Sequence, residues 1–157
     1  MRTGWLAFAM TCLAPFAWAD FAAGVAAYQK QDYATALKEW QPLADGGSPD
    51  AQFNLGLLYL DGKGVPKSYD EAAKWFQRAA DQGQVEAQHN LGALYAMGEG
   101  VKKNNVQAYK WFSVCAAKGN AGCASQRDLI EKKLRGAKLS SAQRLASEWK
   151  PSAEPTH

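Results

Sequence analysis

The 157-residue chain is poor in the residues that build catalytic and metal centres. It has only two histidines, His89 and His157, and neither is spaced from a cysteine or carboxylate as in a zinc site. No glycine-rich phosphate loop follows a strand, because no strand is apparent in the sequence. These absences predict a protein without a metal ion or cofactor.

Excess charge of one sign is also lacking. The formal net charge is +3, and the isolated pairs Lys102-Lys103 and Lys132-Lys133 are expected to be solvated. This balance gives no indication of nucleic acid or an anionic membrane surface as a partner. After residue 19, no apolar stretch approaches the ~20 residues that a membrane-spanning helix needs.

The first nineteen residues have the pattern of an export signal. Arg2 precedes an apolar run from Trp5 to Leu13, and Ala17-Trp18-Ala19 supplies the small-x-small cleavage pattern. An amphipathic first helix is the alternative, although the run has no polar face. We therefore expect a mature chain that begins at Asp20 and is periplasmic or secreted.

Two stretches of the chain match each other at an offset of 36 residues. Residues 50–56 (DAQFNLG) return as 86–92 (EAQHNLG), 62–65 (GKGV) as 98–101 (GEGV), and 74–76 (KWF) as 110–112. A period of this length marks stacked supersecondary units, none of which can bury its apolar face alone. Such stacks present extended surfaces that usually bind other molecules.

Each 36-residue unit is interpreted as two helices. In the first unit, Ser48 is an N-cap before Pro49, and Ser68 with Glu71 forms a capping box for the second helix. Asn104 with Gln107 repeats this plan one period later. Glycine at 56 and 92 is unfavourable inside a helix, so we expect a neighbouring helix to approach there with an aromatic ring packed over the gap.

The flanks extend the pattern at both ends. Residues 20–47 predict an N-terminal hairpin, 48–83 and 84–119 two full repeats, and 120–150 a C-terminal capping hairpin, followed by a disordered tail at 151–157. In the cap, a new apolar stripe includes Leu129, Ile130 and Leu134. Ser140 with Gln143 is expected to cap a last helix that buries Leu139, Leu145 and Trp149.

The repeat resembles the Sel1-like family, a relative of the tetratricopeptide class. The resemblance rests on Ala51, Leu55, Gly56, Tyr59, Gly62, Gly64, Val65, Asp70, Ala72, Trp75, Phe76, Ala79, Ala80 and Gly83. These residues recur from Ala87 to Gly119, except that Val106 stands in the place of Asp70 and Cys115 in that of Ala79. It implies an all-α fold, a right-handed α-α solenoid of about four helical hairpins. It also implies a non-catalytic adaptor or regulator that binds a protein partner in the bacterial cell envelope, and we expect it to be a monomer.

Two cysteines remain after residue 19. Cys115 takes the place of Ala79 in the repeat and Cys123 that of Ala87, so the two face each other across the turn between hairpins. Export favours a disulfide, as does the similarity to cysteine-rich secreted members of the family with this C-x7-C spacing. Two buried free thiols are the alternative.

Tetratricopeptide geometry would turn certain positions of each first helix towards a concave face. The expected partner-binding residues are Asp50, Phe53, Asn54, Leu57 and Leu60 in the first repeat and Glu86, His89, Asn90, Ala93 and Ala96 in the second. The strip formed by Phe53, Leu57 and Leu60 is either exposed for docking or partly covered by adjacent hairpins. Because the groove has no cluster of Lys or Arg, recognition of a peptide carboxylate is not expected.

Two other functions remain open. Ser147 and Lys150 form a Ser-x-x-Lys motif like that of penicillin-recognising hydrolases, although the Ser-Asp-Asn and Lys-Thr-Gly elements of those enzymes are missing. A β-lactamase-like envelope hydrolase is therefore one alternative. A purely structural periplasmic element without a groove partner is the other.

Overall fold

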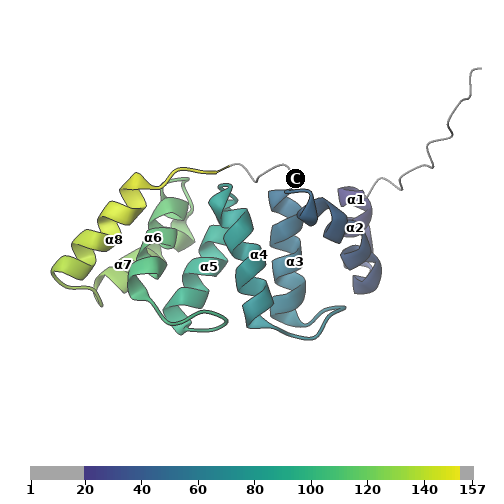
Figure 1. Cartoon of the computed structure of the whole chain (residues 1–157), viewed down its shortest axis with the longest axis horizontal. Coiled ribbons are helices and arrows are strands. Elements are labelled where there is room, and N and C mark those ends of the chain that lie inside the picture. The colour runs from purple at the N-terminus through teal and green to yellow at the C-terminus, as the bar shows by residue number, and fades with distance from the viewer. Residues whose placement is uncertain (1–19, 153–157) are drawn as a thin grey trace, which may run out of the picture.

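The structure is a computed structural model that describes residues 20–152, and within this range it has eight α-helices and no strand. In chain order the helices are α1 (Phe21–Gln29), α2 (Tyr33–Asp45), α3 (Pro49–Asp61), α4 (Tyr69–Asp81), α5 (Val85–Met97), α6 (Asn105–Ala116), α7 (Ala121–Glu131) and α8 (Ala137–Glu148). The helices stand side by side in one elongated row (Figure 1). The predicted all-α solenoid is confirmed, whereas the expected signal at 1–19 lies outside the described residues.

Each helix from α1 to α6 packs on the helix that follows it in the chain. The pairs α1–α2, α3–α4 and α5–α6 therefore form regular hairpins. The last helix differs, because α8 packs chiefly against α6 rather than against α7. The C-terminal cap is thus two helices that both lean on α6, and not a fourth copy of the hairpin.

The starts of the second helices recur with the sequence period. Asp32, Ser68 and Asn104 are the N-caps of α2, α4 and α6, and each side chain accepts a hydrogen bond from a backbone amide in the first turn. The reciprocal half of the predicted capping box at Ser68 is absent. The amide of Ser68 donates instead to the Tyr59 carbonyl at 2.9 Å, which fastens the long turn to the end of α3.

The predicted cap of the last helix is wrong. Helix α8 begins at Ala137, with Gly136 as its N-cap, and Ser140 already lies inside the first turn, where its hydroxyl donates to the Gly136 carbonyl. Gly136 has a positive φ of 52°, which lets the chain turn sharply and start the helix early. Leu129 is not buried as expected but 51% exposed, and Leu139 and Leu145 are only half buried.

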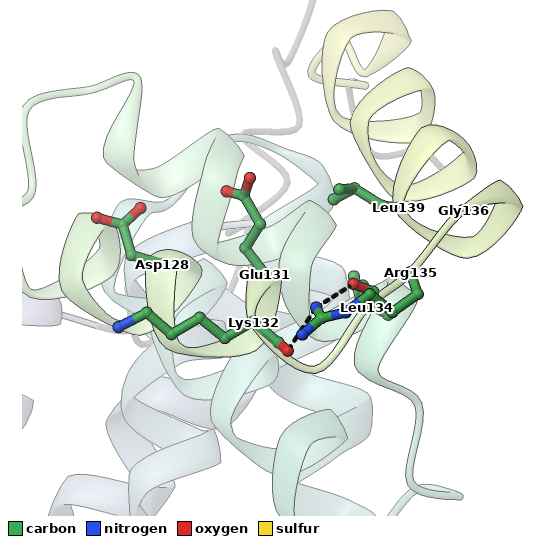
Figure 2. Close-up of a pocket in the computed structure, with 7 residues that line it drawn as sticks. All are labelled: Asp128, Glu131, Lys132, Leu134, Arg135, Gly136 and Leu139. Carbon is green, nitrogen blue, oxygen red and sulfur yellow. Dashed lines mark hydrogen bonds between the residues drawn. The ribbon is translucent and has the colours of Figure 1, made fainter.

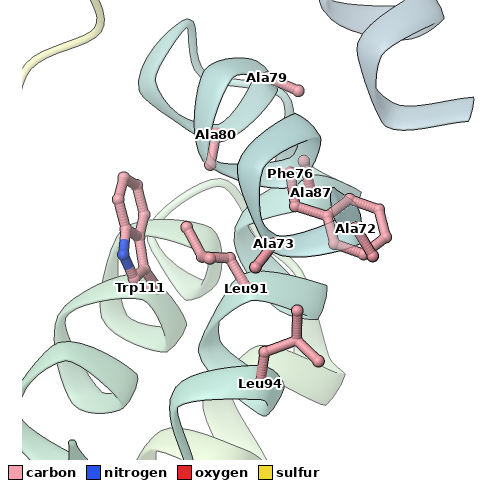
Figure 3. Close-up of a cluster of buried hydrophobic side chains, with 9 residues drawn as sticks. All are labelled: Ala72, Ala73, Phe76, Ala79, Ala80, Ala87, Leu91, Leu94 and Trp111. Carbon is pink, nitrogen blue, oxygen red and sulfur yellow. The ribbon is translucent and has the colours of Figure 1, made fainter. Parts of the chain in front are cut away.

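The core consists of three clusters, each shared between neighbouring hairpins. Figure 3 shows the middle one, in which the Trp111 ring of α6 lies beside Leu91 of α5 and the alanines of α4. As expected, the helical glycines make room for rings. A Cβ at Gly92 would lie 2.9 Å from the Phe112 ring, and one at Gly56 would lie closer still to Phe76.

Buried polar and covalent links join successive hairpins. The Gln52 amide donates to the Ala44 carbonyl at 3.0 Å, and the equivalent Gln88 donates to Ala80 at 3.1 Å. At the third junction, Cys115 and Cys123 form the predicted disulfide, with their Cα atoms 5.8 Å apart. That separation is ordinary for a bridge between these backbones.

The chain beyond α8 turns back over the solenoid. Trp149 follows the last helix residue in an extended conformation, and its ring meets Trp111 edge-on with centroids 6.1 Å apart. The amide of Ser152 then donates to the Asp81 carbonyl at the end of α4, at 2.8 Å. The prediction of a disordered tail from residue 151 therefore does not hold for Ser152, and residues 153–157 lie outside the described range.

Candidate interaction surface

The predicted inner positions of α3 and α5 differ in exposure. Asp50 and Glu86, in the first turns of the two helices, are exposed. The other predicted positions are half buried, namely Phe53, Asn54, Leu57, Leu60, His89, Asn90, Ala93 and Ala96. The strip is therefore partly covered by neighbouring hairpins and partly open.

Phe53 and His89 hold equivalent places in the two repeats and share a packing role. The Phe53 ring lies 5.9 Å from the Phe76 ring, and the His89 ring lies 5.9 Å from the Phe112 ring, centroid to centroid. Both rings thus cover the aromatic side chain that packs on the helical glycine of the same hairpin. His89 is in this respect a packing residue.

The aliphatic positions also have one side against the core. Leu57 and Leu60 pack against the cluster between α4 and α5, and Ala93 and Ala96 pack against the cluster around α6. Because leucine in the first repeat is replaced by alanine in the second, the surface is most apolar around α3.

A small apolar pocket lies at this end of the surface. It has a volume of about 140 Å³ and is lined by Val25 and Tyr28 of α1, Trp40 of α2, and Asn54 and Leu57 of α3. A cavity of roughly 150 Å³ can hold a benzene molecule, so there is room for one apolar side chain. Asn54 is the one amide-bearing side chain in the lining, and it would fix the orientation of what enters.

Sequence reasoning found Asn54 and Leu57 but missed the α1 half of this pocket. Gly24 packs under Trp40 as Gly56 packs under Phe76, which aligns α1 with α3 at an offset of 32 residues rather than 36. With that offset, Val25 corresponds to Leu57 and Tyr28 to Leu60. The turn after α1 is shorter than the turns in the two repeats, so the 36-residue offset does not extend to α1.

The tyrosine at the rim of the pocket is held in place by the neighbouring turn. Lys63 Nζ donates to the Tyr28 hydroxyl at 2.8 Å and lies 3.0 Å from the Asp61 carboxylate. These two interactions raise the pKa of Lys63. Lys63 thus links the turn at 62–68 to Tyr28 at the rim of the pocket.

A larger depression lies at the turn between α7 and α8, away from the predicted groove. Its volume is about 440 Å³, and its lining mixes charges of both signs: Asp128, Glu131, Lys132, Leu134, Arg135, Gly136 and Leu139 (Figure 2). The Arg135 guanidinium folds back on the turn and donates to the carbonyls of Lys132 and Leu134 at 2.7 and 2.8 Å. Arg135 here closes the end of α7.

The two residues of the Ser-x-x-Lys motif form no hydrogen bond with each other. Ser147 Oγ donates to the Arg144 carbonyl at 2.9 Å, inside α8. The helix ends at Glu148, and Trp149 is already extended, so Lys150 does not follow Ser147 by one helical turn. A general base for the serine is thus not supplied by this lysine through helical spacing.

Two further absences hold for the described part of the chain, residues 20–152. None of its helices has the length and apolar character required to cross a bilayer. It also holds no group of three or more His, Cys, Asp or Glu side chains close enough to share a metal ion.

The repeat and the helical architecture both occur in known proteins. The model of the Sel1 repeat matches twice, at residues 49–84 and 85–120. The chain is similar to the crystal structure of c5321, described as a protective antigen of uropathogenic Escherichia coli with an SLR fold, at 35% identity and a TM-score of 0.76. It is also similar to a Sel1 repeat protein from Oxalobacter formigenes, at 29% identity and a TM-score of 0.70.

Both relatives are longer proteins. The match with c5321 covers 80% of this chain and 28% of c5321, and the match with the Oxalobacter protein covers 83% and 56%. The chain thus spans a part of each relative's length.

Proposed function

Since the chain contains two Sel1 repeats within a solenoid of the same type, we propose that it is an exported, non-catalytic interaction protein of the bacterial cell envelope. It recognises a segment of a partner protein along the inner positions of α1, α3 and α5. The observation that carries this proposal is the apolar pocket between Val25, Tyr28, Trp40, Asn54 and Leu57.

The pocket suits recognition because it is built on packed helices. Trp40 is 2% exposed, and its indole N–H donates to the Phe21 carbonyl at 3.2 Å, so the floor of the pocket is fixed before a partner arrives. A preformed site loses little conformational entropy on binding. An apolar side chain of the partner fills the pocket and serves as the anchor.

Two amides extend the surface beyond the pocket. Asn54 and Asn90 occupy the same position one repeat apart and are both half buried. Their amide groups can donate to and accept from the backbone of an extended segment. Asp50 and Glu86 flank them and favour a neutral or basic segment over an acidic one.

The test uses a pair of matched leucines. Leu57→Arg places a charge at the pocket, whereas Leu37→Arg places one on a second helix; both leucines are half buried against a core cluster. The mature chain, from residue 20, is cross-linked in envelope preparations. We expect a captured protein that is lost with Leu57→Arg and with Asn54→Ala but kept with Leu37→Arg. Identical capture by all variants would instead favour a purely structural element.

Export and the absence of catalysis are tested separately. The mass of the protein recovered from the periplasm or medium should correspond to a chain that starts at Asp20. A chain that keeps residues 1–19 and stays in the cytoplasm contradicts export. Turnover of a chromogenic β-lactam that Ser147→Ala abolishes would establish the hydrolase instead.

A further inference from the structure

Positive charge is concentrated on one edge of the solenoid. The turns that lead from each first helix to its second helix are residues 30–32, 62–68, 98–104 and 132–136. Together they carry eight basic and two acidic residues. All four turns lie along one long edge, the lower one in Figure 1, which we call the basic edge.

The opposite edge has the reverse sign. Its turns, residues 46–48, 82–84 and 117–120, carry one lysine and no acid. The helix ends beside them add four carboxylates, from Asp45, Asp50, Asp81 and Glu86. Counted in the same way, the helix ends beside the basic edge add Lys138 and the carboxylates of Asp61, Asp70 and Glu131, so that edge keeps a net positive charge. The small net charge of the whole chain conceals this separation.

Some cations of the basic edge are engaged by the fold. Lys63 is bound to Tyr28 and Asp61, Arg135 to backbone carbonyls, and Lys67 lies over the Tyr69 ring with Nζ 4.6 Å from its centroid. In contrast, Lys102, Lys103, Lys132 and Lys133 are exposed, and their side chains form no ion pair or hydrogen bond with residues 20–152. These four ammonium groups are therefore available to an external anion.

The free lysines gather where two turns meet. Lys103 from one turn, Lys133 from the next and Lys138 from the start of α8 line a single shallow depression of about 350 Å³. Met97, the last residue of α5, directly precedes the turn at 98–104 and is 56% exposed. The basic edge thus combines closely spaced cations with one protruding apolar side chain.

We propose that the basic edge rests on a membrane surface of anionic phospholipid headgroups. Its cations follow an edge and do not line a deep groove of the kind that tracks a polyanion strand, so a plane of phosphates can meet them together. Each lysine beside such a surface strengthens binding by roughly fivefold, and the effect weakens with salt. Met97 enters between the headgroups. This orientation leaves the inner face free for a protein partner.

The test compares two triple variants of equal charge. Lys102→Glu, Lys103→Glu and Lys133→Glu alter the basic edge, while Lys38→Glu, Lys118→Glu and Lys150→Glu alter exposed lysines elsewhere. The mature protein is sedimented with phosphatidylcholine vesicles that contain or lack phosphatidylglycerol, at low and high salt, after circular dichroism has verified folding. Binding should require phosphatidylglycerol, weaken with salt, and fall at least about tenfold more in the basic-edge variant than in the control.

Three outcomes overturn the proposal: no sedimentation of the unaltered protein at low salt, equal loss in both triple variants, or binding to soluble polyphosphate as strong as binding to vesicles. The last result would identify a polyanion site. Leu57→Arg should bind vesicles like the unaltered protein, because Leu57 does not belong to the basic edge. The vesicle assay therefore tests the membrane proposal even if the partner-binding proposal fails.

Discussion

The three junctions between successive hairpins solve one packing problem in two ways. At the α2–α3 and α4–α5 junctions, a buried glutamine of the incoming helix, Gln52 or Gln88, bonds a carbonyl near the end of the preceding helix. At the α6–α7 junction the equivalent position is Ala124, which cannot form that bond, and the neighbouring Cys123 is bridged to Cys115.

The replacement of the glutamine hydrogen bond by a disulfide accompanies a loss of apolar residues in the cap. Where the repeats have Leu55, Gly56 and Tyr59, helix α7 has Arg127, Asp128 and Glu131. These polar residues end the stack, as a terminal unit must, but bury little surface. The covalent bond therefore adds to the packing of α7 on α6 at the point where the stack ends.

The largest effect is expected from removing the disulfide. Replacing both cysteines by alanine should lower the free energy of unfolding by about 2 to 3 kcal/mol, because the loop between them is no longer closed in the unfolded chain. Hydrogen exchange should accelerate in α7 and α8 far more than in α3. The matched control is reduction, which should affect the unaltered protein and leave the double variant unchanged. Equal hydrogen-exchange rates of α7 and α8 in the oxidised and reduced protein would contradict a stabilising role of the disulfide.

The helical glycines allow a comparison between the two regular repeats. Gly56→Ala should destabilise by about 2 kcal/mol, because its Cβ overlaps the buried Phe76 ring. Gly92→Ala should cost less, since its Cβ has 2.9 Å to Phe112 and alanine favours the helix by about 1 kcal/mol. Urea unfolding of the two single variants measures this order. A larger loss for Gly92→Ala would show that the repeats do not share one packing geometry.

The glutamine links should differ in a similar way. Gln52 donates to Ala44 and accepts from Gln82 at 2.8 Å, whereas the buried Oε1 of Gln88 finds no partner within residues 20–152. Gln52→Leu should cost about 1 to 2 kcal/mol, because it removes two hydrogen bonds, the one to the Ala44 carbonyl and the one from the Gln82 amide. Gln88→Leu should cost less, since it also removes an unsatisfied oxygen. Equal losses of unfolding free energy in the two variants, measured with urea, would contradict the expected difference between the two glutamines.

Local and periodic features were predictable from the sequence. Ser68 and Asn104 cap helices because their side chains serve amides two or three residues away, and the disulfide follows once the repeat places two small positions opposite each other. The glycine beneath each ring was predictable for the same reason. All of these depend on contacts within one unit or between equivalent positions.

Features that depend on competition between two possible helix caps, or on contacts between residues far apart in the sequence, were not predictable. Ser140 has the spacing of a cap, but Gly136 starts the helix a turn earlier. Trp149 fits the local apolar stripe, yet it packs across the chain on Trp111. The basic edge is not predictable from the net charge, because a net charge adds up all charged residues and carries no information about where they lie.

The smallest expected effect concerns acid sensitivity at the three equivalent caps Asp32, Ser68 and Asn104. Of these, Asp32 alone is ionisable, and its hydrogen bonds from Thr35 lower its pKa. Because the folded pKa lies below the unfolded value near ~3.9, the stabilisation by this cap is present above about pH 4. It is lost as the pH falls through the folded pKa. Asp32→Asn keeps a capping side chain without a titrating group, so urea midpoints of the variant should decline less between about pH 5 and pH 2 than those of the unaltered protein. Ser68→Asn, at the equivalent cap of α4, is the control and should leave the pH profile unaltered; parallel profiles for all three proteins would show that Asp32 contributes nothing to acid sensitivity.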